Sequence, residues 1–89
     1  MKIIINTLSG EHEFTVRSVG KPTPVMLVRT PEMPSQEEEG MYYLNEVTLF
    51  HLYLRFNQKE NRVEQFVPTW GKWDVFFGEE EITQVDIID

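Results

Sequence analysis

The chain has 89 residues, no cysteine and a net charge of −7 at pH 7, which comes from 15 acidic and eight basic residues. This length supports one domain with one core, so we expect residues 1–89 to fold together. Without cysteine, disulfides and cysteine-ligated zinc are excluded as sources of stability. The negative charge argues against direct binding of nucleic acid, which normally uses a basic surface.

The first predicted element is a β-hairpin. Ile3 and Ile5, and then Phe14 and Val16, alternate with polar residues on either side of the short stretch 8–11, which contains a glycine. Two runs of period two joined by a turn of this kind are typical of a hairpin.

Two segments of different character follow. Residues 25–28 are all apolar and predict a strand that is covered on both faces. Residues 30–41 are rich in proline, glutamate, serine and glycine, and predict a mobile acidic loop.

Residues 45–60 allow two interpretations. As a helix, their apolar side chains would point nearly all round the axis, which a small domain could hardly cover. As a strand, Phe50, Leu52, Leu54 and Phe56 share one face. We therefore favour a strand, followed by a turn at 57–61 and another strand at 62–67, and keep a helix over about 45–60 as the alternative.

The C-terminal part predicts two more strands. Trp73, Val75 and Phe77 alternate with polar or outward positions, which would place these three in the core and leave Phe76 and Trp70 outside. Gly71 could bend the chain so that the two tryptophans lie together, and residues 82–88 read as a final strand.

These elements predict a mainly β fold, namely a small antiparallel sandwich or open barrel of about five to seven strands with at most one short helix. The alternative is an α+β fold in which the helix at about 45–60 packs on an antiparallel sheet.

The acidic residues are unevenly distributed. No lysine or arginine lies between Arg29 and Arg55 or after Lys72, and these two cation-free segments hold 11 of the 15 acids. Such segments commonly serve only solubility, but they also suit a negative face that meets a basic partner.

No catalytic or metal-binding motif is present. Glu11, His12 and Glu13 are adjacent, but in a strand His12 points away from both glutamates, and His51 belongs to another element. The serines stand in no nucleophile motif and there is no phosphate-binding loop. We therefore expect a protein that is not an enzyme and uses no metal or cofactor.

The combined pattern of aromatics beside acids predicts a protein-interaction module. We expect an inhibitor that occupies a basic, nucleic-acid-binding surface of a larger protein, and in size and charge the chain resembles small acidic inhibitors of defence nucleases, which phages and mobile elements encode. The short apolar run at residues 3–5 is no secretory signal, so we expect the cytoplasm and no membrane partner. The predicted partner-binding residues are Trp70, Asp74, Phe76, Glu79, Glu80, Glu81, Glu37, Glu38, Glu39, Tyr42 and Tyr43.

Two other hypotheses stay open. One is a nucleotide- or sugar-binding protein in which Trp70 and Trp73 stack on the ligand. The other is a structural subunit that forms a homodimer or larger homo-oligomer, in which the strands at 25–28 and 82–88 pair between copies.

Overall fold

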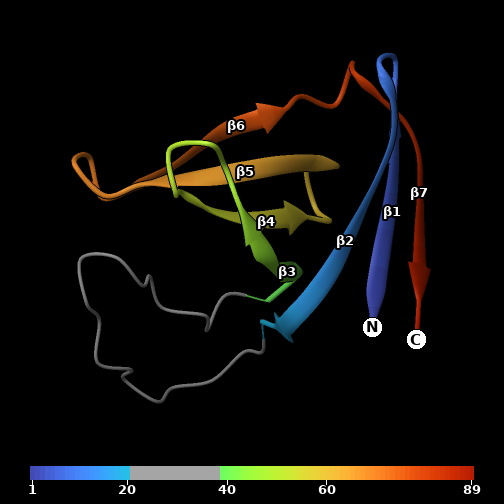
Figure 1. The fold of residues 1–89 in the computed structure, drawn as a ribbon, viewed down its shortest axis with the longest axis horizontal. Helices are drawn as coiled ribbons and strands as arrows, with labels where there is room; N and C mark the ends of the chain where they lie inside the picture. The colour runs from blue at the N-terminus through green and yellow to red at the C-terminus, as the bar shows by residue number, and fades with distance from the viewer. Residues whose placement is uncertain (21–38) are drawn as a thin grey trace.

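The computed structural model describes residues 1–20 and 39–89, and within these ranges all regular secondary structure is β-strand. The seven strands are β1 (Lys2–Thr7), β2 (Gly10–Val19), β3 (Met41–Val47), β4 (Tyr53–Asn57), β5 (Arg62–Val67), β6 (Lys72–Phe77) and β7 (Ile82–Ile88). They form one antiparallel sheet in the order β6-β5-β4-β3-β2-β1-β7 (Figure 1). The predicted mainly β fold is confirmed, and the alternative helix over about 45–60 is wrong. The strand predicted at 25–28 and most of the loop predicted at 30–41 lie outside the described residues.

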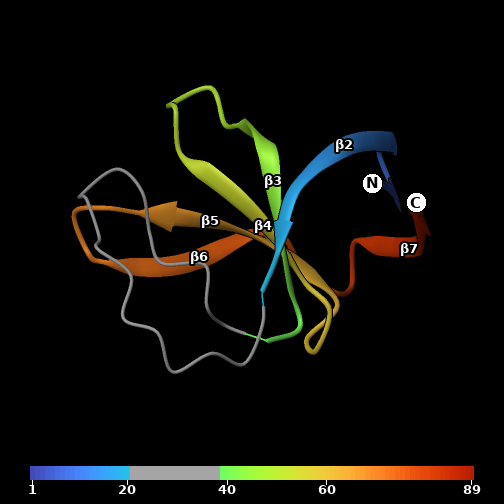
Figure 2. The same cartoon turned by 90° about the horizontal axis from the view of Figure 1, so that it is seen from below.

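The sheet folds over on itself. The long strand β2 pairs with β1 along its first half and with β3 along its second half. As a result β1 and β7 run steeply across the direction of β4, β5 and β6 (Figure 1), and β2 curves between the two groups (Figure 2). The chain ends lie side by side, because Lys2 of β1 is opposite Ile88 of β7.

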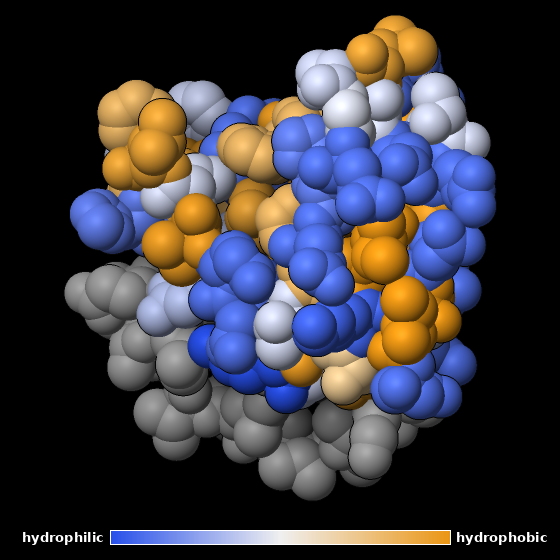
Figure 3. Space-filling model, turned by 45° about the vertical axis from the view of Figure 1, so that its right-hand side comes forward, coloured by the Kyte–Doolittle hydropathy of each residue, from blue (hydrophilic) through white to orange (hydrophobic). Residues whose placement is uncertain are grey.

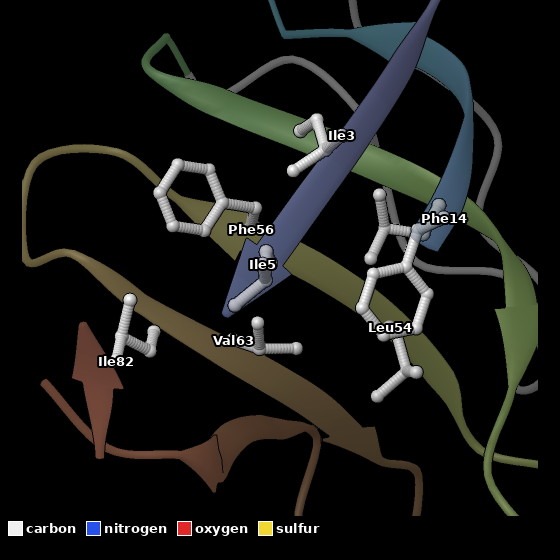
Figure 4. Close-up of a cluster of buried hydrophobic side chains, with 8 residues drawn as sticks. Ile3, Ile5, Phe14, Leu54, Phe56, Val63 and Ile82 are labelled. Atoms are coloured by element: carbon white, nitrogen blue, oxygen red, sulfur yellow. The ribbon is translucent and has the colours of Figure 1, made fainter. Parts of the chain in front are cut away.

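The hydrophobic core fills the space between the two halves of the folded sheet. Figure 4 shows side chains from β1, β2, β4, β5 and β7 converging there. Each such aliphatic or aromatic side chain contributes about 1.5–3 kcal/mol by its removal from water. The buried members are Ile3, Ile5, Phe14, Leu44, Leu54, Phe56, Val63 and Ile82.

The predicted first hairpin is confirmed. Ile3 lies opposite Phe14, and Thr7 lies opposite Gly10 at the turn. The Ser9 amide donates a hydrogen bond to the Thr7 hydroxyl at 3.2 Å, which stabilises the two-residue connection.

The connection between β3 and β4 differs from the prediction. A continuous strand through Phe50 was expected, but the chain turns here because the Thr48 hydroxyl accepts hydrogen bonds from the amides of Phe50 and Leu52 at 3.2 and 3.1 Å. The side chains of Leu49 and Phe50 are consequently 96% and 83% exposed. Only Leu54 and Phe56 of the predicted apolar face are in the core.

Both outermost strands contain a bulge. In β6, Phe77 is opposite Val63 while Val75 is opposite Glu64, so β6 has one extra residue at Phe76. Phe77 therefore packs on the core, whereas Trp73 and Val75 lie on the other face of the sheet. The expectation that Trp73, Val75 and Phe77 all fill the core is wrong, and Val75 is 44% exposed.

In β7 the extra residue is Thr83, since Asn6 is opposite Gln84 and Thr7 is opposite Ile82. The bulge lets both Ile82 and Val85 face the core, which strict alternation would not allow.

Candidate functional site

The two edges of the sheet are formed by β6 and β7. Within the described residues β6 pairs only with β5, and β7 pairs only with β1. The outer backbone N–H and C=O groups of both strands therefore have no described strand beside them. A tight turn joins the two strands and is closed by a hydrogen bond from the Glu81 amide to the Gly78 carbonyl at 3.0 Å. We call β6, this turn and β7, together with the terminal Asp89, the acidic edge.

The acidic edge carries negative charge that the described part of the chain does not neutralise. It holds no lysine or arginine beyond Lys72 at its start, and its carboxylates make no ion pair with any described residue. All six carboxylate side chains are exposed, namely those of Asp74, Glu79, Glu80, Glu81, Asp86 and Asp89.

Apolar side chains are exposed beside these carboxylates. Val75 and Phe76 of β6 are 44% and 37% exposed, and Ile87 and Ile88 of β7 are 39% and 48% exposed. Trp70, in the turn that leads into β6, is 66% exposed. Figure 3, which brings the side of β1 and β7 forward, shows apolar areas set among hydrophilic ones. The acidic edge thus combines charge, apolar area and open backbone groups.

The remaining predicted site residues lie elsewhere. Glu39 is exposed just before β3, which is three strands away from β6, and Tyr42 is half-buried with its ring 6.2 Å from that of Phe56. Tyr43 is only 1% exposed, because β3 is an inner strand and its ring packs 6.0 Å from Trp73. Tyr43 is therefore not a surface anchor. Glu37 and Glu38 lie outside the described residues.

A second surface feature lies on the face of β4–β6 opposite the core. It is a cavity of about 420 Å³, which we call the cationic cleft. Four of the eight basic residues of the chain line it, together with Trp73 and two glutamates. These basic residues are Arg55, Lys59, Arg62 and Lys72.

Glu64 organises the floor of the cleft. Its carboxylate accepts hydrogen bonds from Arg55 Nε at 2.7 Å, from Arg62 Nε at 2.6 Å and from Asn57 Nδ2 at 3.2 Å. The Arg55 guanidinium also lies over the Trp73 ring at 4.2 Å, a cation–π contact. The side chains of Arg55 and Glu64 are 7% and 2% exposed, so this ion pair belongs to the interior of the fold.

These contacts shift two pKa values. Burial opposes ionisation of Glu64, but the hydrogen bonds from Arg55 and Arg62 outweigh it and hold the pKa of Glu64 below its usual range. The hydrogen bond to Glu64 likewise raises the pKa of Arg62. Glu64 therefore has a structural role, since its carboxylate is engaged by Arg55, Arg62 and Asn57.

The sequence interpretation missed the cleft, although the spacing of the basic residues signalled it. Arg55 pairs with Glu64 and Asn57 pairs with Arg62 across the hairpin of β4 and β5. A turn at 57–61 therefore places basic residues from both sides of it close together.

Two other expectations concern single side chains. Gly71 does bend the chain, with a φ of 63°, yet Trp70 and Trp73 make no ring contact, because Trp73 packs on Phe66 at 5.3 Å. The His12 ring lies 4.8 Å from that of Phe77, while its neighbouring glutamates are exposed. Among residues 1–20 and 39–89 no three His, Asp or Glu side chains form a group that could hold a metal ion.

Comparison with protein-family models, with curated proteins and with solved structures found no match for this chain. The described residues also contain no helix with the length and hydropathy needed to cross a membrane.

Proposed function

We propose that this chain is a non-enzymatic interaction module that binds a larger basic protein through its acidic edge. The observation that carries the proposal is that the two edge strands, the turn between them and the terminal Asp89 together hold six exposed carboxylates beside exposed apolar side chains. The partner is a protein with a basic surface, because an excess of carboxylates that the fold leaves unpaired is complementary to such a surface.

The arrangement suits recognition in two ways. Exposed carboxylates speed the encounter with a cationic surface, and exposed apolar groups such as Phe76 and Ile88 add contact area once water is displaced. The open edges of β6 and β7 also offer backbone hydrogen bonds to a strand or loop of the partner.

A basic protein surface commonly binds nucleic acid, so a module that occupies it would act as an inhibitor by presenting carboxylates where phosphates lie. The proposed activity is therefore competition with nucleic acid in the cytoplasm, with no bond made or broken by the module itself.

The test compares two charge reversals of equal size. Glu79→Lys with Glu81→Lys changes the acidic edge, and Glu11→Lys with Glu13→Lys changes two exposed residues of β2 by the same net charge. Each variant and the unmodified chain are used as bait in a bacterial lysate, and each captured protein is then challenged with duplex DNA and with RNA.

We expect to find proteins that the unmodified chain and the β2 variant both capture but that the edge variant does not capture. Nucleic acid should displace these proteins from the unmodified chain. If both variants capture the same proteins, or if nucleic acid displaces none of them, the carboxylates serve only to keep the sheet edges from self-association.

A further inference from the structure

The cationic cleft concentrates the charge opposite to that of the whole chain. Four basic residues and two glutamates line it, although the chain as a whole has a charge of −7. Glu64 is engaged by Arg55 and Arg62. Lys59 and Lys72 are exposed and make no ion pair with any described residue. The cleft therefore keeps positive charge that no carboxylate among residues 1–20 and 39–89 neutralises in an ion pair.

Part of this charge is held in a fixed position. Arg62 uses its Nε to bond Glu64 at 2.6 Å, and its side chain is still 37% exposed. The other N–H donors of this guanidinium make no hydrogen bond to a described residue. A guanidinium anchored on one side with donors left over is suited to bind an oxyanion.

The surroundings limit the size of the ligand. A neighbouring cavity of about 170 Å³ shares Glu60 and Arg62 with the cleft and is also lined by Glu79 and Glu80. A long polyanion that extended past Arg62 would meet these carboxylates and be repelled. A compact anion avoids them, whereas a nucleic-acid strand does not.

The volume of about 420 Å³ lies in the ordinary range for a small-molecule site and exceeds the needs of a single inorganic ion. We propose that the cleft binds a small phosphate-bearing molecule, with a phosphate held by Lys59 and Arg62 and the rest of the ligand beside Trp73 and Lys72, which lie toward the other end of β5. This site shares strand β6 with the acidic edge but uses none of its carboxylates, and it does not depend on the function proposed for the edge.

Binding is measured by fluorescence on the full chain carrying Trp70→Phe, so that Trp73, which lines the cleft, is the one remaining tryptophan. The probes are inorganic pyrophosphate and adenosine diphosphate, with ribose as an uncharged control, at low salt. We expect a saturable change in Trp73 emission with the two phosphates and none with ribose. Tighter binding of the nucleotide than of pyrophosphate would assign a nucleotide, and equal binding would assign the phosphates alone.

The variant Lys59→Gln with Lys72→Gln should weaken binding at least about tenfold, because two of the cations that line the cleft are lost. The matched control, Lys2→Gln with Arg17→Gln, removes two cations that do not line the cleft and should change affinity less than about twofold. Calorimetry and urea unfolding show whether each variant binds and folds.

The proposal is overturned if neither phosphate binds saturably up to about 5 mM, or if the control variant weakens binding as much as the cleft variant. Neither result would bear on partner binding by the acidic edge, since none of these substitutions changes its carboxylates and Trp70→Phe is common to all the chains compared.

Discussion

The acidic edge and the cationic cleft share strand β6 but use carboxylates in opposite ways. The carboxylates of the edge are exposed and make no ion pair with any described residue, whereas Glu64 in the cleft is 1% exposed and accepts hydrogen bonds from two arginines and an asparagine. Removal of a buried, bonded carboxylate is costly because its partners are left unpaired in the interior, whereas removal of an exposed one costs little. The edge carboxylates are thus free to meet a partner, and Glu64 is not.

The two surfaces also show that net charge is a poor description of this chain. Glu60 and Arg62 line both the cationic cleft and the neighbouring cavity that contains Glu79 and Glu80. The local charge therefore changes sign between adjacent hollows of one small sheet. Binding of an anion and binding of a basic protein are compatible on such a surface.

The substitution with the largest expected effect on stability is Glu64→Ala. It leaves the buried Arg55 without its carboxylate, so we expect the free energy of unfolding to fall by about 3–5 kcal/mol, as measured by urea denaturation. Glu80→Ala, at an exposed position of the acidic edge, should change it by less than about 0.5 kcal/mol. Equal losses of stability in the two variants would contradict the distinction between Glu64, which the fold needs, and the edge carboxylates, which it does not need.

A smaller effect separates two neighbouring aromatics of β6. Phe77 packs on the core and Phe76, at the bulge, is 37% exposed. We expect Phe77→Ala to destabilise the fold by about 2–4 kcal/mol and Phe76→Ala by less than about 1 kcal/mol. A larger loss of stability from Phe76→Ala would mean that its ring is needed for folding, which would contradict its assignment to partner binding.

A smaller difference in stability is expected between substitutions of the two tryptophans, of which Trp73 is packed and Trp70 is exposed. Trp73→Phe removes part of the contact with Arg55 and should cost about 1–2 kcal/mol in chemical denaturation. Trp70→Phe should cost less than about 0.5 kcal/mol, since Trp70 is 66% exposed. The reverse ranking would contradict the packing of Trp73 on the sheet.

The smallest expected effect is on the dependence of stability on pH. The pKa of Glu64 is lower in the folded chain than the ordinary glutamate value of 4.5. Its ionised form thus favours the fold above about pH 4.5, and this contribution is lost as the pH falls through the folded pKa. Glu64→Gln should make the acid side of the stability curve shallower by at most about one proton, whereas Glu80→Gln should leave it nearly unchanged. Identical acid limbs for the unmodified chain and Glu64→Gln would contradict the role given to the arginines.

The sequence predicted the fold best where strands alternate without interruption. Ile3, Ile5 and Phe14 occupy the positions that simple alternation assigns to them. It failed where one side chain or one extra residue redirects the chain. The Thr48 hydroxyl stops a strand before Phe50, and the bulge at Phe76 separates Val75 from Phe77. Both are local hydrogen-bonding effects that hydropathy does not encode.

The parts of the site that the sequence predicted are those formed by residues close together in the chain. The cation-free run after Lys72 marked the acidic edge, because β6 and β7 are consecutive in the chain. The contribution of β7 through Ile87 and Ile88 was missed, since only the pairing order shows that it is an edge. The cationic cleft was missed because its residues meet through the pairing of β4, β5 and β6.

The most direct measurement is the association rate of a partner captured by the unmodified chain, followed at rising salt concentration. For docking through the acidic edge, the rate should fall about tenfold or more between low and high salt, and Glu79→Lys with Glu81→Lys should slow association at low salt to a similar extent. The β2 variant, Glu11→Lys with Glu13→Lys, should associate at close to the original rate. Association that ignores salt, or that slows equally in the two variants, would contradict a role for the acidic edge in binding.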